Sequence, residues 1–178
     1  MKFLAISLPA LAGSALAVPY RPQAFDIMAL RSASPIHFAP LSAAQGSLFL
    51  NLRHQGATCK GANNRATFYL DESKLFLYSD GDVVQQVYVD RSGMGQGKIG
   101  YITGDARAPR NAEFDGWSID PAGNLVFHNN ILQACPGSID DSWSVWLTEV
   151  INPGGNTGCL GFSPRSLPID KPVSCVYS

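Results

Sequence analysis

Carboxylate side chains are the groups in this sequence with the chemistry to cleave a glycosidic bond. Such hydrolysis needs two carboxyl groups about 5 to 10 Å apart, one of which holds its proton near neutral pH. The candidates are Glu113 with Asp115, Asp140 with Asp141, and Glu149. Several of them stand beside glycine, proline or serine, where an aspartate commonly caps a turn. We therefore predict a protein that is not an enzyme, and we keep a glycoside hydrolase as the third hypothesis, after two kinds of binding protein.

The histidines and serines of the sequence do not form a catalytic or metal-binding pattern. His37, His54 and His128 are far apart in the chain, and no two of them have the spacing of metal ligands. The sequence contains no Gly-x-Ser-x-Gly elbow of the kind that presents a nucleophilic serine. We expect no catalytic residue, no metal ligand and no cofactor.

A glycine-rich segment, Gly95–Gly100, has the G-x-G-x-x-G spacing that binds dinucleotides when a helix follows it. Here the following residues have the composition of another strand, so no helix N-terminus is available for a pyrophosphate. The segment Asp90–Gly97 is then a turn between two strands, and its glycines allow the backbone to approach a ligand closely. We predict this turn as a binding loop, with contacts from Asp90, Arg91 and Gly95.

Aromatic side chains in the sequence could stack on the faces of sugar rings. They include Trp117, Trp143, Trp146, Tyr69, Tyr78, Tyr88 and Tyr101. Side chains of a strand alternate between its two faces, so a strand over Trp143–Leu147 places Trp143 and Trp146 on opposite faces. We predict that Trp117 and Trp143 belong to the core, because large aromatic side chains dominate the cores of small β domains. Trp146 is equally consistent with the core and with a ligand contact, and we take it as a candidate contact.

The elements that must position these residues are short apolar and aromatic runs separated by Gly, Pro, Asn, Asp or Ser. Such runs predict β-strands, among them one over Pro35–Leu41. Two stretches, 67–78 and 116–128, resemble each other and predict β-hairpins around Asp71 and Asp120. We predict an all-β fold: a small antiparallel barrel, β-trefoil-like, is favoured, and a β-sandwich is the alternative.

The first residues of the chain have the three zones of a secretory signal peptide. Lys2 is basic, the segment 3–11 is apolar apart from one serine, and a small-x-small motif ends at Ala17. We predict a signal peptide over residues 1–17, cleavage between Ala17 and Val18, and a single secreted domain over residues 18–178.

Removal of Lys2 with the signal peptide changes the formal net charge of the chain from −1 to −2. Without a clustered basic face, neither nucleic acid nor a membrane surface is an expected partner, and no lipid anchor is encoded at the C-terminus.

Four cysteines follow the predicted signal peptide. They are Cys59, Cys135, Cys159 and Cys175. An even number of cysteines in an exported protein predicts two disulfides, and the sequence leaves all three possible pairings open. A zinc site is disfavoured because no two cysteines have the C-x-x-C spacing.

Several segments of the chain are similar to the PhiA-like cell-wall proteins of filamentous fungi. The resemblance is carried by Phe25–His37, Gln85–Asp90, Ala134–Pro136 with Trp143–Trp146, and Cys159–Phe162. Its most specific part contains Arg31, Ser34, Pro35 and His37.

This resemblance implies a small protein that is secreted or held in the cell wall and takes part in asexual development, the formation of phialides and conidia. Some relatives of this kind are allergens, and the family supplies no catalytic residues. Its cysteine positions differ from those of this chain, so no disulfide pairing is carried over. We predict a non-catalytic wall-associated protein with wall polysaccharide as its partner. A carbohydrate-binding module or secreted effector is the alternative, and the oligomeric state stays open.

Overall fold

The structure, a computed structural model of the chain, describes residues 22–178. The predicted signal peptide and its cleavage site at Ala17 and Val18 lie outside these residues. Within them the chain forms antiparallel β-strands and two short 3-10 turns, η1 (Ile139–Asp141) and η2 (Pro153–Gly155). The strands are β1 (Ala24–Leu30), β2 (Leu41–Ala44), β3 (Ser47–Leu50), β4 (Thr58–Cys59), β5 (Thr67–Asp71), β6 (Lys74–Leu77), β7 (Gln85–Asp90), β8 (Lys98–Thr103), β9 (Ala112–Glu113), β10 (Trp117–Ile119), β11 (Leu125–Phe127), β12 (Leu132–Cys135), β13 (Trp143–Leu147), β14 (Leu160–Pro168) and β15 (Cys175–Val176).

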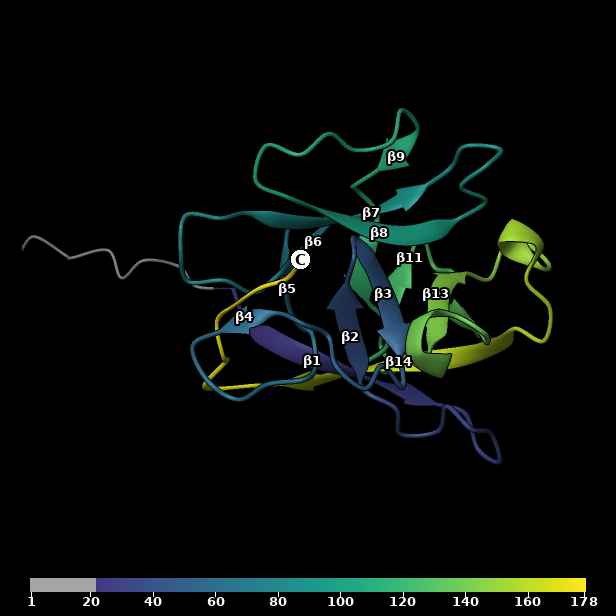
Figure 1. Ribbon diagram of the computed structural model, residues 1–178, viewed down its shortest axis with the longest axis horizontal. Coiled ribbons are helices and arrows are strands. Elements are labelled where there is room, and N and C mark those ends of the chain that lie inside the picture. The colour runs from purple at the N-terminus through teal and green to yellow at the C-terminus, as the bar shows by residue number, and fades with distance from the viewer. Residues whose placement is uncertain (1–21) are drawn as a thin grey trace, which may run out of the picture.

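Eleven of the described strands form one sheet, in the order β2-β3-β8-β13-β12-β14-β1-β5-β6-β7-β9. The longest ladder pairs β1 with β14, from Phe25 opposite Pro168 to Leu30 opposite Ser163. Figure 1 shows β7, β8 and β9 along one side of the molecule and β1 with β14 along the other. The strands β10–β11 and β4–β15 form two small additional pairs.

The prediction of an all-β antiparallel fold is confirmed, and of the two architectures considered the sandwich describes it. The favoured trefoil-like closed barrel was the wrong choice between them. At three places neighbouring strands share a single residue pair: Phe76 with Gln86, Trp146 with Lys98, and Ser47 with Gly100. Strand pairing is therefore sparse at these places, while buried side chains from strands throughout the sheet form one core. The described strands also range from two to nine residues, so the regular three-fold repeat of a trefoil is not formed.

Alternation along the strands explains why one face of each is buried. In β7, Val87 and Val89 are fully buried in the core, whereas the alternating residues Gln86 and Tyr88 point outward and are half-buried. The same alternation in β13 buries Val145 and packs Trp143 against the core. Trp117 is fully buried as well, so the assignment of Trp117 and Trp143 to the core is confirmed.

Two disulfides staple the fold, as predicted. Cys59 on β4 is bonded to Cys175 on β15, across 116 positions of sequence, and Cys135 at the end of β12 is bonded to Cys159 just before β14. Since the two members of each pair are far apart in sequence, the folded sheet decides which of the three pairings forms.

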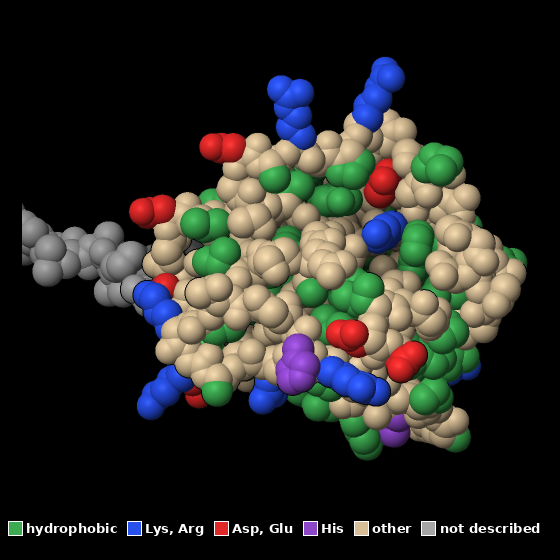
Figure 2. Space-filling model, viewed as in Figure 1, with side chains coloured by type: hydrophobic (Ala, Val, Ile, Leu, Met, Phe, Trp, Pro, Cys, Tyr) green, Lys and Arg blue, Asp and Glu red, His purple; other side chains and the backbone are tan. Residues whose placement is uncertain are grey.

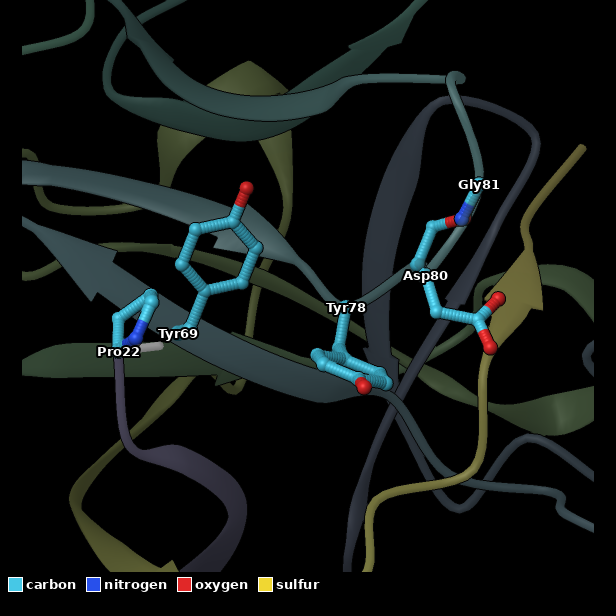
Figure 3. A pocket seen from close by; sticks show the side chains of 6 residues that line it. Pro22, Tyr69, Tyr78, Asp80 and Gly81 are labelled. Atoms are coloured by element: carbon cyan, nitrogen blue, oxygen red, sulfur yellow. The ribbon is translucent and has the colours of Figure 1, made fainter. Parts of the chain in front are cut away.

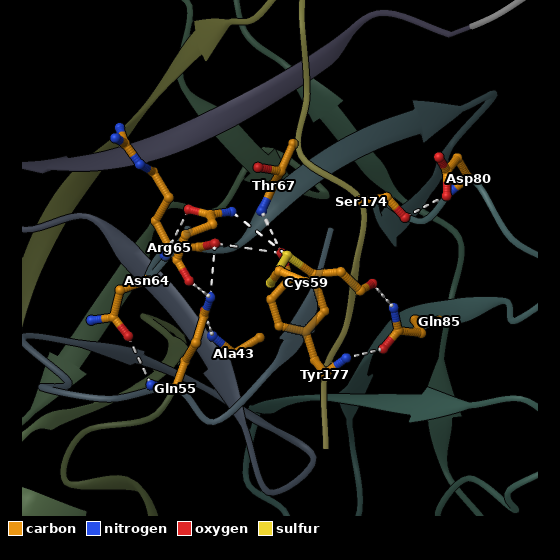
Figure 4. Close-up of a disulfide and its surroundings, with 12 residues drawn as sticks. Ala43, Gln55, Cys59, Asn64, Arg65, Thr67, Asp80, Gln85, Ser174 and Tyr177 are labelled. Carbon is orange, nitrogen blue, oxygen red and sulfur yellow. Dashed lines mark hydrogen bonds between the residues drawn. A yellow bond between two sulfur atoms is a disulfide. The ribbon is translucent and has the colours of Figure 1, made fainter. Parts of the chain in front are cut away.

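The C-terminal segment is held inside the fold by more than its disulfide (Figure 4). The Gln85 side chain donates to the Cys175 carbonyl at 3.0 Å and accepts from the Tyr177 N–H at 2.7 Å. The Tyr177 hydroxyl accepts from the Thr67 N–H at 3.1 Å. Burial raises the pKa of Tyr177 to about 12, so the phenol stays neutral and keeps these bonds over the ordinary pH range.

Candidate functional site

Two of the candidate catalytic carboxylates, Glu113 and Glu149, meet around one arginine. Arg91 donates through Nε to Glu113 at 3.1 Å, and its two terminal nitrogens bind both oxygens of Glu149. Asn130 adds a further hydrogen bond to Glu149 at 2.6 Å, and the Arg91 guanidinium lies 5.5 Å from the centre of the Phe127 ring. Both carboxylates are thus used to hold Arg91 on the surface and join β7, β9 and the segment after β13.

The remaining candidate carboxylates lie apart from this cluster. Asp115 accepts a hydrogen bond from the Ser73 hydroxyl at 3.2 Å, beside Lys74. Asp140 and Asp141 are exposed in the turn η1, where both have positive φ values. Among the described residues, no three His, Cys, Asp or Glu side chains are placed to hold a metal ion.

The glycine-rich turn between β7 and β8 is closed by its own hydrogen bonds. The Asp90 carboxylate accepts from the Ser92 N–H at 2.8 Å, and the Ser92 hydroxyl accepts from the Gly95 N–H at 2.8 Å. Gly95 is buried against Asp90: a Cβ at this glycine would lie 2.1 Å from the Asp90 carboxyl carbon. A side chain at this position would displace the Asp90 carboxylate from its place against the turn. Binding by this turn stays a prediction, and its N–H groups at Ser92 and Gly95 are already used.

Trp146 is 8% exposed and lines a hollow of about 310 Å³ on the outer side of β13. Its indole N–H donates to the Ser144 hydroxyl at 2.8 Å. The glycine-rich turn reaches this hollow indirectly: Gln96 accepts from the Gly154 N–H at 2.7 Å, and Gly154 packs against the Trp146 ring. The structure therefore places the turn and Trp146 side by side, with Lys98 rather than Asp90 or Arg91 lining the hollow.

A second surface hollow is lined by two tyrosine rings (Figure 3). We call it the tyrosine groove; its volume is about 310 Å³ and its lining residues are Pro22, Tyr69, Tyr78, Ser79, Asp80 and Gly81. Tyr69 and Tyr78 come from β5 and from the residue after β6, and both rings are half-buried. Tyr69 also stacks on Phe76, with ring centroids 5.1 Å apart and planes inclined by 12°.

The tyrosine groove continues past Tyr78 into a neighbouring hollow of about 250 Å³. The two hollows share Pro22 and Tyr78, and the second is also lined by Asp170 and Pro172. In Figure 3 the Tyr69 ring lies between Pro22 and Tyr78, and the two tyrosine rings are steeply inclined to each other. The two hollows together form one extended groove.

Charges near the tyrosine groove are largely balanced. Asp80 forms an ion pair with Lys60 at 2.9 Å and its N–H donates to the Ser174 hydroxyl at 3.0 Å. The hydrogen bond from Lys60 lowers the pKa of Asp80. Burial raises the pKa of Tyr69, and the charge of Asp71 adds to this, so its hydroxyl remains a proton donor. The groove thus offers apolar ring faces with hydroxyl and carboxylate groups at the rim.

The segment with the most specific family resemblance forms a closed turn after β1. The Ser34 hydroxyl donates to the Arg31 carbonyl at 2.8 Å, and the Arg31 N–H donates to Nδ1 of His37 at 3.1 Å. The Pro35 carbonyl accepts from the Asn51 side chain at 3.0 Å. These contacts give the segment a structural role in fixing the turn.

Tyr69 and Tyr78 are among the aromatic residues that could stack on sugars, but the sequence does not indicate that they lie together. Nor does it indicate a site at Pro22 or Asp80. A signal for the pair was present: Tyr69, Phe76 and Tyr78 occupy the outward positions of a predicted hairpin, where an aromatic side chain is not needed for the core.

The fold and these surfaces define a class: a small all-β domain stapled by two disulfides, with open aromatic grooves on its exterior. The family model of the PhiA-like secreted proteins matches residues 25–178. The chain belongs to this family.

Several named relatives extend over almost the whole chain. A cell wall protein phiA from Emericella nidulans is 47% identical over 175 residues, covering 97% of this chain and 96% of the relative. Its counterpart from Aspergillus fumigatus is 45% identical and covers 98% and 96%. That from Arthroderma benhamiae is 43% identical and covers both chains fully. No solved structure is significantly similar to this chain.

These findings confirm the family resemblance drawn from the sequence and the expected secreted, cell-wall location. None of the helical segments within residues 22–178 has the length and apolar character of a membrane span.

Proposed function

We propose that this protein is a non-catalytic component of the fungal cell wall that binds a neutral wall polysaccharide in the tyrosine groove. The relatives named as cell wall proteins support the location. The observation that carries the binding function is the pair of half-buried rings, Tyr69 and Tyr78, on the outside of the sheet.

Stacking between tyrosine rings and sugar rings is the physical basis of the proposed binding. A pyranose presents an apolar face of C–H groups, which an aromatic ring covers with little loss of side-chain entropy because the ring is already held in place. Tyr69 is held by its stacking on Phe76. The sugar hydroxyls at the rim then find partners in the tyrosine hydroxyls and in Ser79 and Asp80.

A neutral polymer suits this groove better than an acidic one. The carboxylates at its two ends are Asp80, already paired with Lys60, and Asp170. A polymer carrying carboxylates of its own would meet like charges there. We therefore take β-glucan and chitin as the test polymers.

A non-catalytic role is supported by the placement of the carboxylates. Glu113 and Glu149 are bound to Arg91, and Asp115 and Asp140 lie apart from them on other turns.

The role in asexual development follows from the family resemblance. Deletion of the gene should then reduce the number of conidia or alter the phialides, and a mutant strain with normal conidiation would contradict this part of the proposal.

Sedimentation with insoluble β-glucan and chitin tests the binding function. Tyr69→Leu keeps the apolar volume but removes the flat ring, and Tyr78→Leu does the same at the second position. Loss of one stacked ring should weaken binding about five- to tenfold, since a single aromatic contact contributes roughly 1 kcal/mol beyond its buried area.

Phe38→Leu serves as the matched control because Phe38 is a more exposed ring on a distant turn, 61% exposed. It should bind as the parent does. Equal retention of all three variants, with unchanged thermal unfolding, would show that the groove is not the binding surface.

A further inference from the structure

A second groove lies around Trp146 and differs from the tyrosine groove in its charge. The hollow of about 310 Å³ beside Trp146 shares Gln45, Ser47 and Lys98 with a neighbouring hollow of about 590 Å³. We call the two together the basic groove. It crosses β3 and β8 on the face that carries the C-terminus (Figure 1), where Figure 2 shows separate hydrophobic and charged side chains among backbone and other residues.

The two cations of the basic groove are not neutralised by neighbouring side chains. Lys98 and Arg107 line it, both are exposed, and within residues 22–178 neither forms an ion pair. Asp90 stands opposite Lys98 in the β7–β8 ladder, but its carboxylate is turned to the Ser92 N–H. These ammonium and guanidinium groups are therefore available to an anion.

The basic groove also carries groups that fit a sugar. Trp146 and Tyr88 contribute aromatic surface at its two ends. Ser47 and Gln45 line both hollows of the groove. Their polar side chains are of the kind that pairs with sugar hydroxyls.

We propose that the basic groove binds an acidic polysaccharide, one whose sugar rings carry carboxylates, and that the domain thereby joins this polymer to the neutral polymer in the tyrosine groove. This second step rests on the proposed function of the tyrosine groove. The C-terminal segment runs from one groove to the other: Pro172 lines the extension of the tyrosine groove, and Ser178 lines the basic groove. Because Cys175 and Tyr177 anchor that segment, the two grooves keep a fixed separation.

Direct binding of polygalacturonate to the soluble domain tests the basic groove by itself. Lys98→Gln and Arg107→Gln should each weaken binding about five-fold, and added salt should weaken it further. Arg110→Gln removes the same charge from an exposed arginine outside the groove and should bind as the parent does. Equal weakening by all three variants would show attraction by net charge alone and overturn the proposal. So would equally tight binding of a single-stranded oligonucleotide, which would mark a general polyanion surface.

A bridging assay tests the joining of two polymers. β-Glucan particles coated with the protein should capture fluorescent polygalacturonate and not neutral dextran. The Lys98→Gln protein should stay on the particles but capture about five-fold less polymer. If the parent protein coats the particles but captures no polygalacturonate, bridging is refuted, and the binding of β-glucan by the tyrosine groove is still supported. If the parent protein binds polygalacturonate in solution but does not bind the β-glucan particles, the proposed function of the tyrosine groove is refuted. The binding of an acidic polymer by the basic groove is then still supported.

Discussion

Removal of the disulfide between Cys59 and Cys175 should destabilise the protein more than removal of the other disulfide. A cross-link restricts the unfolded chain, and its effect grows with the length of the loop that it closes. The two bonds span 116 and 24 positions. The chain-entropy relation then gives about 5 kcal/mol for the first bond and about 3.5 kcal/mol for the second at 25 °C.

The two disulfides form a matched comparison. Each joins one buried cysteine, Cys175 or Cys135, to one half-buried cysteine, Cys59 or Cys159. Double replacement by alanine therefore removes similar packing from each site, and the difference of about 1.5 kcal/mol reflects mainly the loop length. A loss of about 5 kcal/mol is comparable to the whole stability of a small domain, so the first variant should be only marginally folded.

Urea unfolding of both double-alanine variants, followed by circular dichroism, measures the difference. The Cys59/Cys175 variant should unfold at the lower urea concentration. Hydrogen exchange should also show faster opening of residues 173–178 in that variant, because noncovalent contacts, such as the hydrogen bonds of Gln85, then hold the segment without a covalent link. An equal or larger loss in the Cys135/Cys159 variant would refute the loop-length reasoning.

Two further predictions concern the dependence of stability on pH. Burial is the main cause that raises the pKa of Asp26 above the usual aspartate value of 3.8. The folded chain therefore keeps the Asp26 proton at pH values where the unfolded chain has released it. As a result, the free energy of unfolding falls as the pH rises above 3.8. In the Asp26→Asn variant the side-chain oxygen still accepts from the Thr67 hydroxyl, and the thermal unfolding temperature should change less between about pH 4 and pH 7 than in the parent. The same pH dependence in both proteins would show that Asp26 does not cause it. Burial likewise raises the pKa of Tyr101 and of Tyr177 to about 12, so stability should fall as pH rises from 10 toward 12. Tyr177→Phe should lose less stability than the parent over that range in urea titrations, and an equal loss would show that Tyr177 does not contribute.

Local features of the fold could be predicted from neighbouring residues. The hairpins around Asp71 and Asp120 form as expected, as β5–β6 and β10–β11, and Asp120 accepts from the Asn124 N–H at 2.8 Å. The predicted strand over Pro35–Leu41 is wrong for most of its length. Phe38 has a φ of 63° there, and β2 begins only at Leu41. Hydrogen bonds from Arg31 to His37 and from Asn51 to Pro35 outweigh the β-propensity of these residues.

The carboxylates show where reasoning from sequence stops. Glu113 and Glu149 stand 22 and 58 positions from Arg91, and all three meet only because β7, β9 and the end of β13 converge. No short-range pattern in the sequence indicates this ion-pair cluster. Of the candidate catalytic carboxylates, Glu113 and Glu149 anchor one arginine in the structure, whereas Asp115, the sequence partner of Glu113, is bonded to Ser73 instead.

Four features could be predicted from the sequence alone: the class of the fold, the export, the number of disulfides and the opposite faces of Trp143 and Trp146. Each of these depends on composition or on the two-residue period of a strand, which act over a few neighbouring residues. The tertiary structure decided the cysteine pairing, the sandwich rather than the barrel, and the two grooves. These depend on contacts between distant segments, such as Pro22 with Asp80 across the tyrosine groove, and only the packing of the whole sheet brings such residues together.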